Sequence, residues 1–456
     1  MNDNLNGKTG GGLGFGKSMI YTSGQFGGNI LNVVYAGWVL YFYTNDAGGR
    51  KPLTTMAIMT ALIIGGRIVD ALADPLIGYW SDRTNTRIGR RRPFILIGTP
   101  FLLISFILLF NPPFPAGSAA LIASTFITMG FFWFFFTAVM GPYLSLIPEL
   151  ASSSAERVRL TTFLAIAMLV ANAYQGMIVP KMVDQKAWNW GYSNMAFFSA
   201  AMSFFFLYIT GLFIREKPRT AAASPQPEQK EKYSFTEAFL WTLKNRAFTC
   251  YILASVLQYI GFASLMGSVP FIVTRLMGKP ESYVTTVYIF SLPSIVVSFF
   301  IINFLAPRTG KVRLYQICLF LLAFFLPFLF FIGRVQLPVT EATAGLILIA
   351  LLGFPITGNM VLPMAILADI VDYDEKVTGL RREAMYFGMQ GFLQKAATAM
   401  SQGLQGILFA VFGYSVTNHL GINLLGPVAG LSGLIGFLIF LKYPLDEKTK
   451  DLKAKA

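Results

Sequence analysis

Long apolar stretches, separated by short polar segments, run along almost the whole chain. Twelve of them are long enough to cross a membrane, at residues 18–44, 53–80, 94–111, 118–147, 160–180, 193–214, 247–274, 281–305, 312–333, 342–372, 384–412 and 421–441. A transmembrane helix needs roughly 20 predominantly apolar residues. The pattern therefore predicts an all-α polytopic membrane protein with twelve transmembrane helices.

One polar segment is much longer than the others and divides the chain. Residues 215–246 are rich in Pro, Ala, Ser, Gln, Lys and Glu, a composition that buries too little apolar surface to form a packed core. We expect a cytoplasmic linker here, between a six-helix bundle at 18–214 and a second one at 247–441. Cytoplasmic tails at 1–17 and 442–456 complete the predicted organisation.

The two halves echo each other at corresponding positions. A polar loop, Asp82–Arg90, follows the second stretch, and Arg308–Arg313 follows the eighth. The fourth stretch ends in Pro142–Glu149, and the tenth contains Pro363–Asp369 near its end. Two pseudo-symmetric bundles of six helices are the plan of the major facilitator fold, in which a central cavity lies between the repeats.

Composition agrees with a membrane protein. Of the 456 residues, 55% are hydrophobic and only 13% are charged, and the mean hydropathy is +0.59. Soluble domains carry about 25% charged residues, so this composition excludes an ordinary soluble domain. The two cysteines, Cys250 and Cys318, lie in apolar stretches, and we interpret them as packing residues.

The net charge of +14 reflects membrane topology rather than a nucleic-acid partner. When the loops are assigned alternately to the two sides, 27 of the 36 Lys and Arg fall on the side of both termini and 7 on the other. Cytoplasmic loops carry such an excess of positive charge. We expect a multi-pass protein of the plasma (inner) membrane with both termini in the cytoplasm, and no binding of nucleic acid.

Three ionisable residues lie inside the second stretch. Arg67, Asp70 and Asp74 are spaced i, i+3 and i+7, which places them on one face of a helix. Charged residues inside spans mark ion and substrate pathways, because buried charge is costly unless paired. Two carboxylates one turn apart are tolerated when a cation lies between them or when one is protonated. We interpret them as a coupling-ion site; the alternative is an Arg67–Asp70 pair that only holds helices together.

Lys395 lies about ten residues inside the eleventh stretch, among small residues and glutamines such as Gln390. We expect it to face the cavity and to approach the carboxylates of the second stretch. The alternative is a lysine that extends to the membrane interface. Gln390 offers hydrogen bonds to a polar substrate or to a neighbouring helix.

An aromatic run in the fourth stretch, Phe131–Phe136, includes Trp133. Such a run forms either a stacking platform or a packing and lipid-facing surface. We interpret it as packing and lipid-facing mass.

Other function classes find little support in the residues. A channel is expected to show rings of identical polar residues, and a membrane enzyme needs a nucleophile with its base or a metal cluster; neither pattern is visible. We expect no bound cofactor. A membrane sensor with the same fold, which binds a solute without transporting it, stays open as an alternative.

Two segments resemble the signatures of one transporter family. DALADPLIGYWSDRTNTRIGRRRPFILIG (70–98) and DIVDYDEKVTGLRREAMYFGMQGFLQK (369–395) are similar to those of the glycoside–pentoside–hexuronide:cation symporters, the melibiose permease-like family of the major facilitator superfamily. YFYTNDAGG (41–49) is a shorter match, and spans and loops agree over nearly the whole chain. The resemblance implies a secondary active transporter without a cofactor that couples uptake of a sugar or glycoside to Na⁺ or H⁺.

The resemblance also suggests where the ion and the substrate bind. By position, the cation site falls on Asp70, Asp74 and Thr137. Chemistry and resemblance together give the candidate substrate residues Asn29, Arg67, Tyr143, Gln390 and Lys395. We expect a monomer in the lipid bilayer that binds a small molecule.

Several positions depart from the sugar-specific melibiose permeases. An asparagine that helps to bind Na⁺ is replaced by Ala73, and the two substrate-binding aspartates by Asn29 and Met140. A tryptophan and an arginine are replaced by Leu144 and Leu164. We therefore place a sugar or glycoside first and an amphiphile such as a lysophospholipid second, with other organic solutes as the remainder.

The mechanism implied is alternating access. We expect cation binding at the carboxylates to complete the substrate site, after which the halves rock about it. Charged loops on the cytoplasmic side would close this gate through Asp82, Arg83, Arg87, Arg90, Glu149, Arg308, Arg313, Asp372, Arg381 and Arg382.

Overall fold

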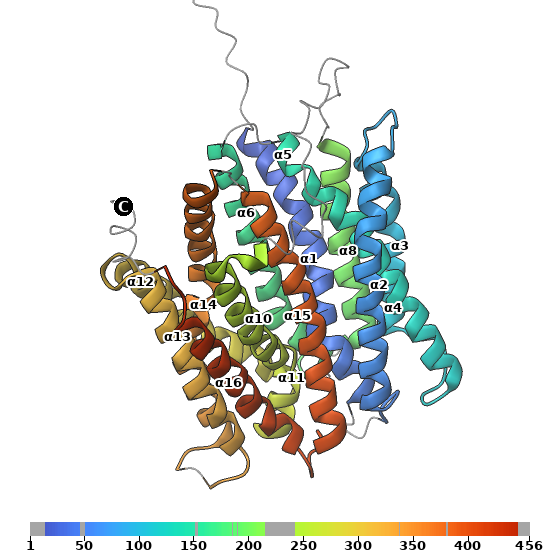
Figure 1. The fold of residues 1–456 in the computed structure, drawn as a ribbon. Helices are drawn as coiled ribbons and strands as arrows, with labels where there is room; N and C mark the ends of the chain where they lie inside the picture. Colours follow the sequence, from blue (N-terminus) through green and yellow to red (C-terminus); the bar gives the residue numbers. More distant parts are fainter. Residues whose placement is uncertain are drawn as a thin grey trace, which may run out of the picture. The chain divides into compact units, whose positions relative to one another are not determined.

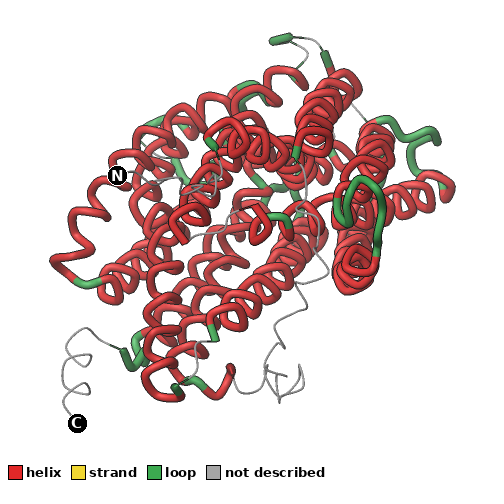
Figure 2. Tube along the Cα trace, turned by 90° about the horizontal axis from the view of Figure 1, so that it is seen from above, coloured by secondary structure: helices red, strands yellow, loops and turns green. Residues whose placement is uncertain are grey.

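The computed structural model describes residues 14–45, 51–150, 154–184, 186–188, 190–214, 242–336, 338–379 and 382–445. Within these ranges the chain is helical, without a named strand (Figure 2). Most of the two predicted tails and of the predicted linker lie outside the described residues, and so does the predicted gate residue Arg381.

Twelve helical segments of the described chain correspond to the twelve predicted spans (Figure 1). The first six are α1 (Phe15–Thr44), α2 (Met56–Arg83), α3 (Arg92–Phe110), α4 (Ala119–Ser145), a fifth built from α6 (Ser154–Ala173), the π-helical turn η2 (Tyr174–Ile178) and α7 (Val179–Val183), and α8 (Gly191–Phe213). The other six are α10 (Arg246–Gly267) continued by α11 (Val269–Phe271) and the π-helical turn η3 (Ile272–Leu276), α12 (Tyr283–Thr309), α13 (Lys311–Phe325) with the 3₁₀ turn η4 (Leu326–Phe331), α14 (Glu341–Thr378), α15 (Glu383–Phe412) and α16 (Leu420–Phe440). A four-residue helix, α5 (Ile147–Leu150), was not expected.

Ten helical segments of the described residues are both long and apolar enough to cross a membrane. The two others, α1 and α15, have 30 residues each but are more polar. Both carry buried amide side chains: Gln25 and Asn29 on α1, and Gln390 and Gln405 on α15.

Two compact units make up the chain. Unit 1 contains residues 1–39, 65–185 and 189–223, and unit 2 contains residues 40–64, 186–188 and 224–456. The last change from unit 1 to unit 2 falls at 223/224, inside the predicted linker, while the end of α1 and the first part of α2 are grouped with unit 2. The predicted six-helix bundles at 18–214 and 247–441 stay a prediction. Within unit 1, α3 packs against α4 and α8; within unit 2, α10 packs against α15 and α16, and α14 against α12 and α13.

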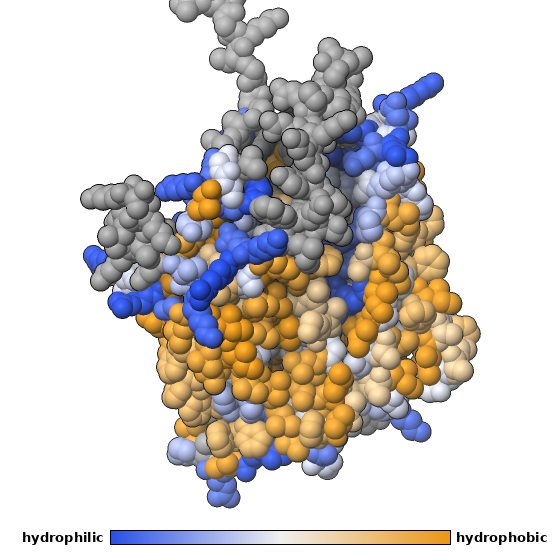
Figure 3. Space-filling model, viewed as in Figure 1, coloured by the Kyte–Doolittle hydropathy of each residue, from blue (hydrophilic) through white to orange (hydrophobic). Residues whose placement is uncertain are grey.

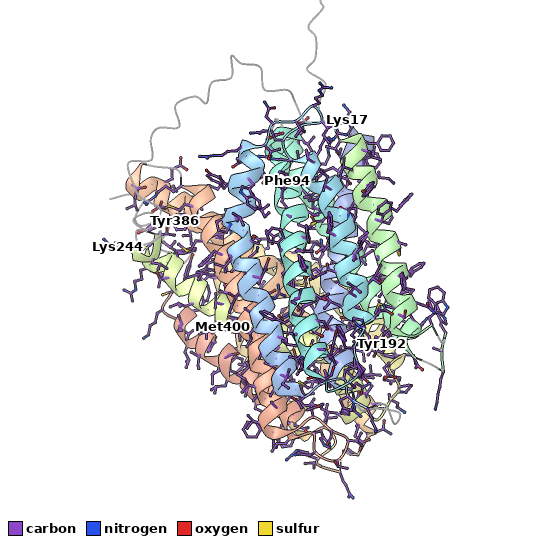
Figure 4. The ribbon with its side chains drawn as sticks, turned by 90° about the vertical axis from the view of Figure 1, so that its right-hand side faces the viewer. Lys17, Phe94, Tyr192, Lys244, Tyr386 and Met400 are labelled. Atoms are coloured by element: carbon purple, nitrogen blue, oxygen red, sulfur yellow. The ribbon has the colours of Figure 1, made fainter. Side chains whose placement is uncertain are left out.

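Helices alternate in direction within each unit. Lys17 and Phe94, at the starts of α1 and α3, lie at one end of unit 1, whereas Tyr192, at the start of α8, lies at the other (Figure 4). In unit 2, Lys244 and Tyr386 lie at the same end (Figure 4), and Asn245 Nδ2 donates to the Tyr386 hydroxyl at 3.0 Å. Hydrophobic side chains cover the middle of the helices on the face drawn in Figure 3, and hydrophilic ones gather at the helix ends. This distribution is the one a bilayer requires.

The predicted similarity between corresponding loops of the two halves is visible in backbone and side chains. Gly89 precedes α3 with φ 118°, and Gly310 precedes α13 with φ 84°, a region that favours glycine. The cation after each glycine binds a carboxylate: Arg90 Nη2 lies 2.7 Å from Glu149, and Lys311 Nζ lies 2.7 Å from Asp369. The same turn and the same ion pair are thus built twice.

Candidate functional site

Asp70 is the centre of the candidate ion site in unit 1. Asp70 is only 6% exposed. The Thr137 hydroxyl on α4 donates to Asp70 Oδ1 at 2.7 Å, and Arg67 Nη1 lies 3.6 Å from Asp70 Oδ2. The structure thus brings together three of the residues that the sequence singled out. A buried carboxylate of this kind is stable only with positive charge or hydrogen-bond donors beside it.

Glycines let α2 approach α4 at this level. A Cβ on Gly66 would lie 3.0 Å from the Trp133 side chain, and one on Gly65 would lie 2.6 Å from the Phe126 ring. Because glycine has no side chain, the two helices pack closely enough for Thr137 to reach Asp70.

The sequence had predicted a packing or lipid-facing role for Trp133, but the structure places it beside the candidate ion site. The guanidinium carbon of Arg67 lies 3.7 Å from the centroid of the Trp133 ring. Trp133 is 1% exposed, whereas Phe131 in the same run is 53% exposed. The expected packing role therefore describes Trp133 only in part, because its indole also contacts the positively charged guanidinium of Arg67. Its position one turn before Thr137 was the available signal, since residues four apart share a helix face.

Asp74 lies one turn beyond Asp70 on α2 and is half-buried. Pro75 follows it inside the helix and, having no N–H, leaves the carbonyl of Ala71 without its usual helical donor. Oxygen atoms of this kind are what a hard cation binds. The role of Asp74 in the cation site stays a prediction.

A polar stripe on α1 was only partly expected. Asn29 Nδ2 donates to the Gln25 carbonyl at 2.9 Å, and Thr22, Gln25 and Asn29 are all at most 9% exposed. Among the described residues, the side-chain oxygens of Thr22 and Gln25 have no hydrogen-bond partner. Buried polar atoms normally have a partner, so these two oxygens are candidates for contacts with water or a solute. The spacing of Thr22 and Gln25 from Asn29, by seven and four residues, was the missed signal.

Tyr143 is placed differently from the expectation that it faces a substrate. It is fully buried, its ring stacks on Tyr21 at 4.5 Å, and the two hydroxyls each donate to the other residue's backbone carbonyl, at 2.6 and 2.8 Å. This reciprocal pair joins α1 to α4. In the described conformation the Tyr143 hydroxyl is used in helix packing, and a substrate role stays a prediction that requires the pair to open.

Unit 2 contains the other two candidate substrate residues, both on α15. Gln390 is 3% exposed, and its Oε1 atom has no partner among the described residues, as is also true of Gln405 Nε2. Lys395 is exposed. Its expected approach to the carboxylates of α2 stays a prediction.

Most of the first predicted gate forms a cluster at one end of unit 1. Glu149 accepts from Arg90 at 2.7 Å and pairs with Arg91 at 3.0 Å, and Arg91 also lies 4.0 Å from Asp82. Arg91 also donates to the Ser145 carbonyl. Arg91 was not among the predicted gate residues, although it follows Arg90 directly.

The remaining arginines of this loop have local roles. Arg83 lies over the ring of Tyr79, 3.9 Å from its centroid, and donates to its hydroxyl. Arg92 donates to the carbonyls of Gly211 and Leu212 at 2.8 and 2.9 Å, which satisfies the C-terminal end of α8. Arg87 is exposed.

The second predicted gate gains one residue. Arg382 binds Asp374 through two hydrogen bonds of 2.9 and 2.7 Å, whereas Asp372 is exposed and its gate role stays a prediction. Residues two apart on a helix point to different sides, so Asp374 and not Asp372 faces Arg382. Arg308 lies over the Phe304 ring, 3.5 Å from its centroid, and Arg313 is exposed.

A further cluster in unit 2 joins the end of α1 to the seventh span; we call it the Tyr41 cluster. The Tyr41 hydroxyl donates to Glu281 Oε1 at 2.9 Å, and Arg275 Nη2 donates to Asn45 Oδ1 at 2.6 Å. The Tyr41 ring also packs edge-on against Phe271, at 4.9 Å. Arg275 belongs to the π-helical turn η3, an element that is frequent at functional sites. Tyr41 and Asn45 lie in the short family match at 41–49, but no sequence pattern had paired them with Glu281 or Arg275.

Comparison with known proteins decides the family. A family model described as MFS/sugar transport protein matches residues 20–447. The chain belongs to this family. The resemblance seen in the two signature segments is thereby confirmed.

The relatives of this family member include characterised carriers. It is 27% identical over 443 residues to the uncharacterized symporter YnaJ of Bacillus subtilis, covering 94% of this chain and 91% of that one. It is 24% identical to the raffinose carrier protein of Pediococcus pentosaceus, covering 87% of this chain but only 63% of the carrier's length. The sodium-dependent lysophosphatidylcholine symporter 1 of Xenopus tropicalis is 22% identical, with 92% and 85% covered.

Solved structures support the same fold. The crystal structure of a D-xylose-proton symporter matches with a TM-score of 0.65 at 16% identity, covering 94% of this chain and 97% of that one. Family and fold together make this chain a multi-pass membrane transporter of the major facilitator type and not an enzyme.

Proposed function

We propose that this family member is a cation-coupled symporter of a sugar or glycoside that works by alternating access. The observation that carries the proposal is the buried Asp70 carboxylate, which binds Thr137 at 2.7 Å and has Arg67 at 3.6 Å. We propose Na⁺ as the coupling ion, bound through oxygens of Asp70, Asp74 and Thr137, with H⁺ as the alternative. Carboxylate and hydroxyl oxygens suit a hard cation.

A lysolipid-like amphiphile is the second candidate substrate. Met140, where the sugar-specific relatives have an aspartate, packs against Gly28 beside Asn29, and Leu164 is buried. Such side chains offer contact area rather than hydrogen bonds. The sugar stays first because Thr22, Gln25 and Gln390 carry buried polar atoms without partners in the described chain.

Uptake into liposomes tests the proposal. The purified protein is reconstituted, and labelled sugars, glycosides and lysolipids are supplied under an imposed Na⁺ gradient, a pH gradient or neither. We expect accumulation of a sugar or glycoside driven by the Na⁺ gradient. Accumulation of a lysolipid alone would favour the second candidate, and specific binding of a solute without any accumulation would support a sensor instead.

We further propose the orientation and the gates. With both termini in the cytoplasm of a plasma-membrane protein, the pairs Arg90–Glu149 and Lys311–Asp369 lie on the cytoplasmic side, and the Tyr41 cluster lies on the external side. We propose that the protein works as a monomer. The Tyr41 cluster then acts as an external gate, whose hydrogen bonds open in every transport cycle.

Replacing Tyr41 by Phe is expected to weaken this external gate. The substitution removes the hydroxyl that donates to Glu281, and hydrogen bonds to charged groups contribute about 1.5–3 kcal/mol. We expect a cysteine placed at Thr60, which packs against Gly406 in the same region, to react about tenfold faster with a membrane-impermeant thiol reagent added outside.

Tyr251→Phe is the matched control, because the Tyr251 hydroxyl has no hydrogen-bond partner among the described residues. The cysteine at position 60 is labelled in three proteins: the Tyr41→Phe variant, the Tyr251→Phe control and the protein with both tyrosines intact. Equal labelling rates in all three would show that the Tyr41 cluster is not a gate.

A further inference from the structure

Arg67 contacts the aromatic ring of Trp133 and lies beside the carboxylate of Asp70. Its guanidinium carbon lies 3.7 Å from the centroid of the Trp133 ring, well inside cation–π range. Its Nη1 atom lies 3.6 Å from Asp70 Oδ2, which is longer than a hydrogen bond. The Arg67 side chain is 11% exposed, so its charge is stabilised mainly by the protein.

The indole is a fixed platform. Trp133 is packed edge-on by Tyr35 at 4.9 Å and by Phe136 at 5.5 Å. Phe132 adds a third edge-on contact at 5.1 Å. Side chains enclosed in this way keep one rotamer. The face of the ring that is turned to Arg67 is therefore held at a constant position beside Asp70.

We propose that Trp133 is a positioning residue of the ion site, which holds Arg67 so that Asp70 is released to the coupling cation. The inference rests on the proposed function, because it takes Asp70 as an ion ligand. When a cation reaches Asp70, the carboxylate is shared between two positive charges. The indole continues to stabilise the guanidinium, which then stays in place without a full ion pair.

Arg67 and the coupling cation compete for the Asp70 carboxylate, and loss of the Trp133 indole would favour Arg67. Without the indole, more of the stabilisation of the buried guanidinium has to come from the carboxylates, because an unpaired buried charge is costly. Arg67 would then bind Asp70 more tightly and exclude the cation. A purely structural role of Trp133 predicts instead a loss of stability that does not depend on Arg67.

A double-mutant cycle on the full-length protein separates these roles, with the Na⁺ affinity measured by calorimetry. We expect Trp133→Leu to weaken Na⁺ binding about tenfold, in line with the strength of a desolvated cation–π contact. Trp133→Phe, which keeps an aromatic face, should retain most of the affinity. In an Arg67→Gln background, Trp133→Leu should have no further effect.

Phe106→Leu is the matched control. Phe106 is fully buried and packs edge-on against Phe110 at 5.3 Å, so its loss removes a buried ring of unit 1 while the three rings packed on Trp133 remain. We expect this variant to bind Na⁺ like the wild type. If Trp133→Leu does not fold, the cycle is run with Trp133→Phe, for which we expect a loss of about threefold that disappears in the Arg67→Gln background.

Three results would overturn the inference: unchanged Na⁺ affinity in the Trp133 variants, an equal loss with and without Arg67, or the same loss in Phe106→Leu. Absence of Na⁺ binding in the wild type would contradict the proposed sodium site and this inference together. The two failures are therefore distinguishable.

Discussion

Replacing Asp70 by Asn is expected to abolish cation-driven uptake while the protein still folds. The amide has the shape of the carboxylate, and its Oδ1 atom still accepts the hydrogen bond from Thr137, which is 2.7 Å long in the wild type. The negative charge that the cation needs is lost. A contact with a charged group contributes about 1.5–3 kcal/mol, so we expect gradient-driven uptake in liposomes to fall about 100-fold.

Glu341→Gln is the control for this change, because Glu341 is an exposed carboxylate in the first turn of α14 and belongs to none of the proposed sites or gates. We expect it to reduce uptake by much less. Uptake by Asp70→Asn with unchanged ion dependence would exclude Asp70 from the coupling site. Size-exclusion profiles of both variants show whether a loss of uptake comes from misfolding.

Replacing Gly421 by Ala is expected to destabilise unit 2 strongly. Gly421 lies at the start of α16, and its N–H donates to the Gly413 carbonyl at 2.9 Å. A Cβ there would lie 2.6 Å from the Gly413 carbonyl oxygen and closer still to that of Leu408. Backbone oxygens have no rotamer by which to move away, so we expect a cost of about 3 kcal/mol and a clear drop in the melting temperature of the purified protein.

Gly391→Ala on α15 is the matched control for this prediction. Nothing lies within 4 Å of a Cβ at Gly391, and alanine favours a helix over glycine by about 1 kcal/mol. We expect unchanged or slightly higher stability. Equal melting temperatures for the two variants would mean that the close approach of α15 and α16 at Gly421 does not limit stability.

The sequence predicts the spans well because span length and apolar content are set by the bilayer. The helices α3, α4 and α8 begin and end within a few residues of the expected stretches. The π-helical turns η2 and η3 were not predicted, since they depend on local backbone geometry and carry no apolar period. The grouping of the end of α1 and the first part of α2 with unit 2 had no signal in the sequence, because a linker shows only where the chain is polar.

The candidate site was partly predictable for a similar reason. Charges inside apolar stretches are conspicuous, so Arg67 and Asp70 were found from composition alone. Trp133 was not, because a tryptophan in an aromatic run has no distinctive pattern until its neighbour across the helix pair is known. Asp374, the partner of Arg382, was not singled out, because two carboxylates close in sequence differ only in the side of the helix they face.

The most direct test of the account is a cation titration of the purified protein. Thermal stability is followed while Na⁺, Li⁺ and K⁺ are added at two pH values, in the wild type and in Asp74→Asn. Ligand binding raises stability by RT ln(1 + [L]/Kd). The account predicts a stabilisation specific to Na⁺ that is lost in the Asp74 variant. No shift with any of the three cations, together with an Asp74 variant that is more stable than the wild type at neutral pH, would contradict a sodium site and indicate proton coupling.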